Sequence, residues 1–140
     1  MNIIIDANIL FSALIKDSKT RELILCYDGF FLFPSYIFIE MEKHKSELLK
    51  KSKISEKDFN RLLQLILKKV VIVPNETLAP HAKEAFGIIK DIDPDDTIFI
   101  ACALAYKNSL LWSDDKKLKR QSKVDIVETK DIIKLIEGRS

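Results

Sequence analysis

Short runs of apolar residues alternate along the chain with longer segments that mix apolar and polar positions. The runs are continuous and only a few residues long, which is typical of strands buried in a parallel sheet. They comprise Asn2 to Ile5, Phe30 to Phe33, Val70 to Val73, Leu110 to Trp112 and Ile126 to Val127. Because strands that alternate with helices imply right-handed crossovers, the pattern predicts an α/β sandwich around a mostly parallel sheet.

The segments between the runs carry helical spacing. One helix is expected where apolar residues recur on a single face, at Phe59, Leu62, Leu63 and Ile66. Ser55 and Asp58 form a weak capping box before that face. A second helix is expected from about Asp95 to Lys107, and a last one begins behind Thr129 as its cap. With no linker or repeat in view, residues 1–140 are predicted to form a single domain.

Composition supports an ordered chain with its own core. The 140 residues are 47% hydrophobic and 31% charged, with three Gly and four Pro, which favours a helix-rich globular domain. No run approaches the about 18 apolar residues of a membrane helix, and no basic leader precedes the first apolar run. We therefore expect a cytoplasmic protein with no membrane partner.

Several kinds of chemistry are excluded because the residues for them are scarce. The three glycines are too far apart for a dinucleotide loop or a Walker phosphate loop. Two histidines and two cysteines cannot form an HExxH motif or a four-thiolate zinc site. We expect Cys26 and Cys102 to be buried free thiols. Carboxylates and lysines remain plentiful, so catalysis should depend on acids and a hard metal ion.

Acidic residues follow the predicted strands at several places. Asp6 ends the first run, Asp114 and Asp115 follow the fourth, and Glu40 stands among apolar residues after the second. A further group precedes a predicted helix, at Asp91, Asp93, Asp95 and Asp96. Each acid alone suits a turn, a cap or a solvated helix face. Because sites in such sheets form at the carboxyl ends of the strands, the joint pattern predicts a pocket for divalent cations and metal-assisted phosphodiester hydrolysis.

Four motifs in order resemble those of a PIN domain. They are IIIDANIL at 3–10, FPSYIFIEMEKH at 33–44, DPDDTIFIACALA at 93–105 and LLWSDDKKL at 110–118. The resemblance covers essentially the whole chain. The family comprises metal-dependent ribonucleases, among them the toxins of toxin–antitoxin pairs. The resemblance implies a three-layer α/β sandwich around a five-stranded parallel sheet in the order 3-2-1-4-5.

The resemblance also implies roles for particular residues. The catalytic acids, which would hold Mg²⁺ or Mn²⁺, are Asp6, Glu40, Asp96 and Asp115. In the family the fourth acid follows a hydroxyl residue after one intervening position, which selects Asp115 over Asp114. The resemblance implies three supporting residues. Asn8 would orient the first acid, Ser113 would supply a hydroxyl near the site, and Asp93 would be an auxiliary acid.

Basic and aromatic segments bear on the substrate. The net charge is only +2, yet residues 43–69 hold nine basic and three acidic residues, and residues 116–123 hold five basic and none acidic. A solvated helix face explains such runs. The sharper hypothesis is that single-stranded RNA is guided toward the metals by Lys116, Lys117, Lys119 and Arg120.

The aromatic-rich segment 27–38 suits core packing, with base stacking or a partner surface as alternatives. The resemblance adds an antitoxin and a homodimer as partners to test.

Three other functions remain open at this point. Aspartate-based phosphatases need a second acid two residues after the first, where this chain has Asn8. Receiver-type signalling domains need adjacent acids near the first strand, where Asp6 stands alone. A non-catalytic RNA-binding scaffold would keep the fold and the basic faces. Metal-dependent cleavage of unstructured RNA, abolished by a chelator, separates a nuclease from all three.

Overall fold

The computed structural model describes residues 1–16 and 18–138. Five strands form one sheet in the order β3-β2-β1-β4-β5, and every neighbouring pair is parallel. The strands are β1 (Asn2–Ile5), β2 (Phe31–Pro34), β3 (Val70–Val73), β4 (Ser109–Trp112) and β5 (Ile126–Val127). The predicted parallel sheet and its strand order are confirmed.

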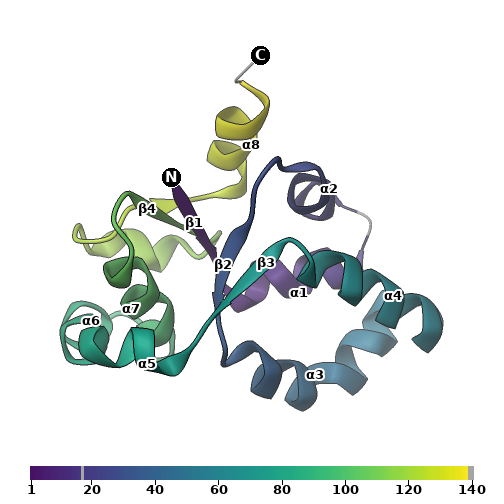
Figure 1. Cartoon of the computed structure of the whole chain (residues 1–140), viewed down its shortest axis with the longest axis horizontal. Coiled ribbons are helices and arrows are strands. Elements are labelled where there is room, and N and C mark those ends of the chain that lie inside the picture. Colours follow the sequence, from purple (N-terminus) through teal and green to yellow (C-terminus); the bar gives the residue numbers. More distant parts are fainter. Residues whose placement is uncertain (17, 139–140) are drawn as a thin grey trace.

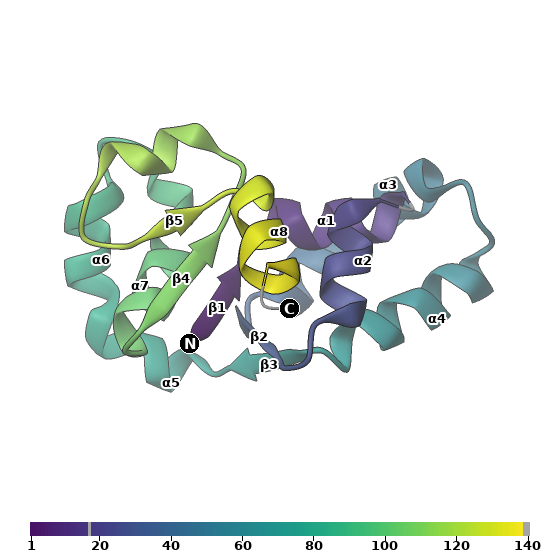
Figure 2. The ribbon, with the colours of Figure 1, turned by 90° about the horizontal axis from the view of Figure 1, so that it is seen from above.

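Helices flank the sheet on both sides (Figures 1 and 2). On one side α7 packs against β1, β2 and β4 and is itself covered by shorter helices. This side comprises α5 (Asn75–Leu78), η1 (Ala79–His81), α6 (Ala82–Ile89), η2 (Pro94–Asp96) and α7 (Thr97–Ala105). The other side comprises α1 (Ala7–Ile15), α2 (Lys19–Cys26), α3 (Ile37–Ser52) and α4 (Glu56–Leu67). The chain closes with η3 (Lys116–Arg120), β5 and α8 (Thr129–Glu137), which packs against α2 and β5.

The central strands are buried on both faces, which is why they are continuous apolar runs rather than alternating ones. Ile3, Ile4 and Ile5 of β1 are all fully buried. The Phe31 ring lies 5.8 Å from the Trp112 ring, and the Phe33 ring meets Phe99 of α7 edge-on at 5.5 Å, centroid to centroid. The first contact joins side chains of two strands, and the second packs the sheet against α7.

The register of β1 and β4 determines where the candidate site forms. Ile5 pairs with Trp112, and the backbone N–H of Asp6 donates to the Trp112 carbonyl at 3.2 Å. Asp6 and Ser113 therefore leave their strands side by side at the carboxyl edge of the sheet. This is the edge at which ligands bind in open α/β sheets.

Some boundaries differ from the sequence prediction for local reasons. β2 begins one residue late, at Phe31, and the Phe30 side chain before it is 62% exposed, with the Lys69 ammonium 5.6 Å from its ring. The helix expected from Asp95 begins instead as the 3₁₀ turn η2, and α7 proper runs from Thr97 to Ala105.

Two other expectations were wrong. Thr129 does not cap the last helix, because Glu128 is its N-cap and forms a capping box with Asp131. Cys102 is buried, but Cys26 at the end of α2 is exposed, although both are free thiols. None of the described helices is both long and apolar enough to cross a membrane.

Candidate metal centre

Asp6 is the most deeply buried acid at the sheet edge. It is 5% exposed, caps α1, and accepts a hydrogen bond from the backbone N–H of Ile9 at 2.9 Å. Burial raises the pKa of its carboxyl, and the charges of Asp114 and Asp115 raise it further. Hydrogen bonds from Ser113 and Ile9 oppose that rise. A buried acid held above its usual pKa is one that a nearby cation would stabilise.

Three other aspartates form a compact acidic group beside it. One carboxylate oxygen from each of Asp93, Asp96 and Asp115 lies within 4.8 Å of the other two. The turn η2 supplies Asp96, with Asp93 as its N-cap, and Asp115 caps η3 just after β4. We define these three residues as the aspartate cluster. Hard oxygen donors at this spacing fit a divalent cation such as Mg²⁺ or Mn²⁺.

The electrostatics of Asp96 show how crowded the acids are. Burial raises its pKa to about 7, with added repulsion from Asp93, Asp6 and Asp115. Asp6 thus acts electrostatically on the aspartate cluster although it contributes no oxygen to it among the described residues. At neutral pH the four carboxyl groups repel one another, and a bound cation would reduce that repulsion.

Lys117 supplies positive charge to this group. Its Nζ lies 3.7 Å from Asp93 Oδ2 and 3.9 Å from Asp115 Oδ2, and it lowers the pKa of Asp96. The lysine side chain is half exposed, so the contact is a screened one. Lys117 is therefore a half-exposed positive charge beside the aspartate cluster.

Asp114 also lines the cleft beside Asp6, but its carboxylate oxygens are hydrogen-bonded to Thr129. Its Oδ1 accepts from the Thr129 backbone N–H at 2.7 Å, and its Oδ2 accepts from the Thr129 hydroxyl at 2.6 Å. The same hydroxyl accepts from the Trp112 indole N–H at 3.0 Å. Asp114 thereby joins the end of β4 to the start of α8, whereas Asp115 joins the aspartate cluster.

Glu40 lies on α3 and stands apart from the aspartate cluster. Its carboxylate accepts from the Tyr36 hydroxyl and lies 3.2 Å from His44 Nε2, and the side chain is 13% exposed. The hydrogen bond to Glu40, with burial and the nearby charge of Asp95, raises the pKa of Tyr36 to about 12. The carboxylate of Glu40 is thus fixed by partners on the preceding and following turns of its own helix.

Two clefts that share lining residues contain some of these acids. A cleft of about 290 Å³ is lined by Asp6, Asn8, Ile9, Ser12, Asp114 and Asp115. A second cleft of about 490 Å³ is lined by Glu40 and His44 and shares Asn8 and Ser12 with the first. Asn8, predicted to support Asp6, is exposed on α1 at the junction of the two clefts. Ser113 is fully buried, and its hydroxyl accepts from the Asp115 backbone N–H at 3.1 Å.

The basic residues of η3 are not equivalent. Lys119 Nζ lies 2.8 Å from Glu128 Oε2, which ties η3 to the start of α8 and raises the pKa of the lysine. Lys116 and Arg120 are exposed and make no ion pair with the residues that the structure describes. With Lys117, which lies beside the aspartate cluster, they form the exposed basic rim of η3.

Sequence reasoning overlooked Tyr36, His44 and Ser12. Tyr36, Glu40 and His44 recur every four residues, so a helix places them on one face. That spacing was a usable signal for the partners of Glu40. Ser12 stands four residues after Asn8 on α1, and the same spacing could have indicated it.

The fold and the site together define a class. The protein is a parallel-sheet α/β protein with an acidic, cation-compatible group at the carboxyl edge of β1 and β4. A comparison with protein-family models matches the PIN domain over residues 4–133, and the chain therefore belongs to the PIN domain family. PIN domains are generally nucleases. Comparisons with curated proteins and with solved structures gave no significant match.

Proposed function

We propose that the protein is a Mg²⁺- or Mn²⁺-dependent ribonuclease that hydrolyses phosphodiester bonds of single-stranded RNA. The observation that carries the proposal is the aspartate cluster beside buried Asp6, at the carboxyl edge of the sheet in a member of the PIN domain family. Divalent ions bound there would polarise the scissile phosphate and lower the pKa of an attacking water. The proposed ligands are Asp6, Glu40, Asp96 and Asp115, to which the geometry adds Asp93.

The residues of the chain have separate tasks in this proposal. In the metal-free protein burial and the neighbouring carboxylates raise the pKa of Asp96 to about 7, and a bound cation would favour its ionised form. Tyr36 and His44 hold the Glu40 carboxylate, which lines the larger of the two clefts. Asn8 stands where the two clefts meet and can hydrogen-bond to Asp6 or to substrate. A phosphate bridging the clefts would contact acids on both sides only with cations between them.

Lysines next to the site suit a polyanion. Lys116, Lys117 and Arg120 line the rim beside Asp115, and Lys117 already lies within 4 Å of two acids. These side chains would hold the sugar-phosphate backbone with little sequence preference. Open clefts at the end of a sheet admit an extended strand more easily than a duplex.

The biological setting belongs to the same proposal. PIN family membership is compatible with the toxin of a toxin–antitoxin pair in the cytoplasm, with an antitoxin protein and a second copy of the chain as partners. A small DNA-binding protein encoded in the adjoining reading frame would support this setting. An isolated gene would point instead to RNA processing.

The test is a cleavage assay with three substrates of the same sequence: single-stranded RNA, duplex RNA and single-stranded DNA. Purified protein with Mn²⁺ or Mg²⁺ is expected to cleave the single-stranded RNA fastest, and a chelator is expected to stop the reaction. Binding of RNA without cleavage in any metal would favour a non-catalytic scaffold. Preferential cleavage of DNA would contradict the substrate class while leaving the metal centre in place.

A further inference from the structure

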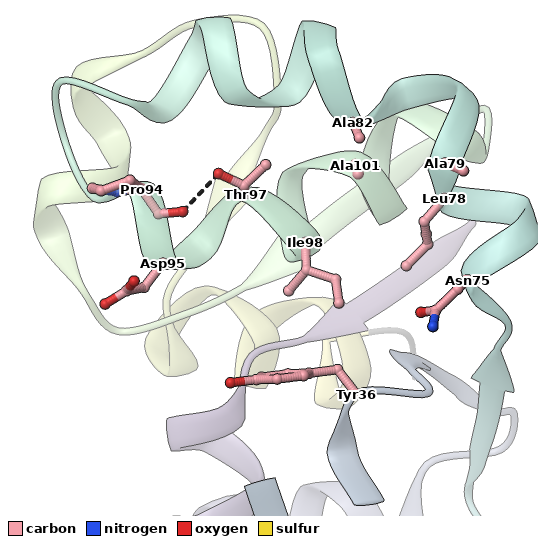
Figure 3. Close-up of a pocket in the computed structure, with 10 residues that line it drawn as sticks. All are labelled: Tyr36, Asn75, Leu78, Ala79, Ala82, Pro94, Asp95, Thr97, Ile98 and Ala101. Atoms are coloured by element: carbon pink, nitrogen blue, oxygen red, sulfur yellow. Dashed lines mark hydrogen bonds between the residues drawn. The ribbon is translucent and has the colours of Figure 1, made fainter. Parts of the chain in front are cut away.

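An apolar pocket of about 500 Å³ lies beside the site, between Tyr36 and the α5–α7 side of the molecule (Figure 3). Its apolar wall comprises Leu78, Ala79, Ala82, Ile98 and Ala101. Tyr36, Asn75, Asp95 and Thr97 contribute polar atoms, and none of the described lining residues is Lys or Arg. A pocket of this size falls in the range of about 300–1,000 Å³ that is usual for small-ligand sites.

Two residues of the pocket wall, Tyr36 and Asp95, also contact acids of the candidate site. Tyr36 forms part of its wall while its hydroxyl donates to Glu40. Asp95 lies in η2 between Asp93 and Asp96, and its backbone N–H donates to the Asp93 carboxylate at 3.2 Å. The Asp95 carboxylate and the Tyr36 hydroxyl lie toward the same side of the pocket (Figure 3). A chain whose phosphate sits at the aspartate cluster would therefore place a neighbouring group here.

The lining chemistry restricts what that group is. With no cation in the described wall and a negative charge at Asp95, a phosphate is disfavoured. The Tyr36 ring, held at its hydroxyl end by Glu40, offers a fixed aromatic surface opposite the Ile98 side chain (Figure 3). Flat heteroaromatic rings stack on such surfaces in proteins that bind single-stranded RNA. An uncharged nucleobase needs no cation in the wall, is not repelled by Asp95 and can stack on Tyr36.

We propose that this pocket binds one nucleobase of the RNA next to the scissile phosphate, stacked on Tyr36, an inference that rests on the proposed ribonuclease function. Asp95 accepts hydrogen bonds only, as an ionised carboxylate does. It therefore favours a base with an exocyclic amino group, such as cytosine, over uracil, whose single N3–H donor lies between two carbonyl oxygens that the carboxylate repels. Asn75, whose Oδ1 accepts from the Ser35 hydroxyl at 3.2 Å, lies at the pocket edge with its amide group toward the same ligand space.

The test uses free nucleosides, which carry no phosphate and need no metal. Titration of cytidine into the metal-free protein is expected to shift the methyl NMR signals of Ile98 and Ala101 saturably, and uridine is expected to bind at least about threefold more weakly. Ala82 is exposed and its methyl group points toward the pocket (Figure 3). Ala82→Leu fills the space and should weaken cytidine binding at least about tenfold.

Gly87→Leu is the matched control, because it adds a larger apolar side chain to the same helix where a Cβ meets nothing within 4 Å. It should leave cytidine binding unchanged. Tyr36→Phe keeps the stacking surface and should retain binding within about threefold, whereas Tyr36→Leu should lose it. Equal binding by wild type and Ala82→Leu, equal binding by Tyr36→Phe and Tyr36→Leu, or shifts confined to other surfaces would each overturn the proposal.

The nucleoside assay and the RNA-cleavage assay test the two proposals independently, so a negative result in one does not determine the other. Nucleoside binding without metal-dependent RNA cleavage would refute the ribonuclease and, with it, the assignment of the pocket to substrate. RNA cleavage without saturable nucleoside binding would refute the base pocket alone. Saturable binding of N-acetyl-leucinamide in place of the nucleosides would assign the pocket to a peptide partner and overturn the proposal.

Discussion

Asp114 and Asp115 are neighbours in sequence but serve different parts of the molecule. Asp114 binds both the backbone and the hydroxyl of Thr129, while Asp115 lies with Asp93 and Asp96. Of two adjacent acids, the first therefore connects α8 to the end of β4, and the second belongs to the aspartate cluster. The pair offers matched substitutions in which charge and size change equally: both carboxylates raise the pKa of Asp6, but only Asp115 belongs to the aspartate cluster.

Asp114→Asn should lower stability without removing a metal ligand. The amide keeps one acceptor oxygen but weakens the two bonds to Thr129, which costs about 1 kcal/mol at this exposed position. The melting temperature is expected to fall by a few degrees in thermal denaturation followed by circular dichroism. Thr129→Val should cause a loss of similar size, because it removes the hydroxyl shared by Asp114 and Trp112. An unchanged melting temperature in both variants would show that this hydrogen-bond chain contributes nothing measurable.

The stability of the metal-free protein should fall as pH rises toward 7. The pKa of Asp96 is 3.8 in the unfolded reference and about 7 in the fold. Between these values the folded state keeps a proton that the unfolded state has released, so stability decreases with rising pH through this window. After allowance for the partial exposure of the carboxyl, the loss amounts to about 1–2 kcal/mol.

Asp96→Asn is the variant that isolates this titration. Its neutral amide removes the repulsion, so urea denaturation in a chelator at pH 8 should find it more stable than wild type. At pH 4.5, where wild-type Asp96 is protonated, the two proteins should be similar. Greater stability of wild type at pH 8 would contradict the raised pKa.

Divalent cations should stabilise the folded protein by mass action. Mn²⁺ at one hundred times its dissociation constant would add about 2.7 kcal/mol to the free energy of unfolding. The rise in melting temperature should be lost in Asp96→Asn and kept in Asp114→Asn, because only the first carboxyl belongs to the aspartate cluster. A melting curve of wild type that millimolar Mn²⁺ leaves unmoved would count directly against the metal centre.

The basic residues of η3 should differ in their contribution to RNA binding. Replacement of Lys116, Lys117, Lys119 and Arg120 by Gln should weaken binding and flatten its dependence on salt, by up to about 0.7 in log–log slope for each phosphate contact. Lys119→Gln alone should hardly change the slope, because this lysine is paired with Glu128. Fluorescence anisotropy with a labelled single-stranded RNA across a salt series measures both. An unchanged slope in the quadruple variant would assign these residues to a solvated face.

The sheet was predictable because burial on both faces leaves a continuous apolar run, as at Ile3 to Ile5. Details that depend on distant partners were not. The Thr129 hydroxyl looked like a helix cap, but Asp114 and Trp112 occupy it, and Glu128 caps α8 instead. No local pattern reveals a hydrogen bond to a residue fifteen positions away.

In the candidate site, too, the positions set by local pattern were predictable and the contacts with distant residues were not. Asp6 and the pair 114–115 could be placed at one edge because parallel strands end there together. The partners of each acid could not be derived from spacing alone. Asp93, expected as an auxiliary, contributes to the aspartate cluster because η2 turns it back toward Asp96. Glu40 instead contacts Tyr36 and His44, and its role as a metal ligand stays a prediction.

The most direct test of the central claim is the rate of Mn²⁺-dependent cleavage of an unstructured RNA by Asp115→Asn and Asp114→Asn, measured side by side below both melting temperatures. Loss of one metal-binding carboxylate should abolish cleavage by Asp115→Asn as thoroughly as Asp6→Asn does, while Asp114→Asn keeps most of the wild-type rate. Inactive Asp114→Asn beside active Asp115→Asn would contradict the assignment of the aspartate cluster as the catalytic metal centre.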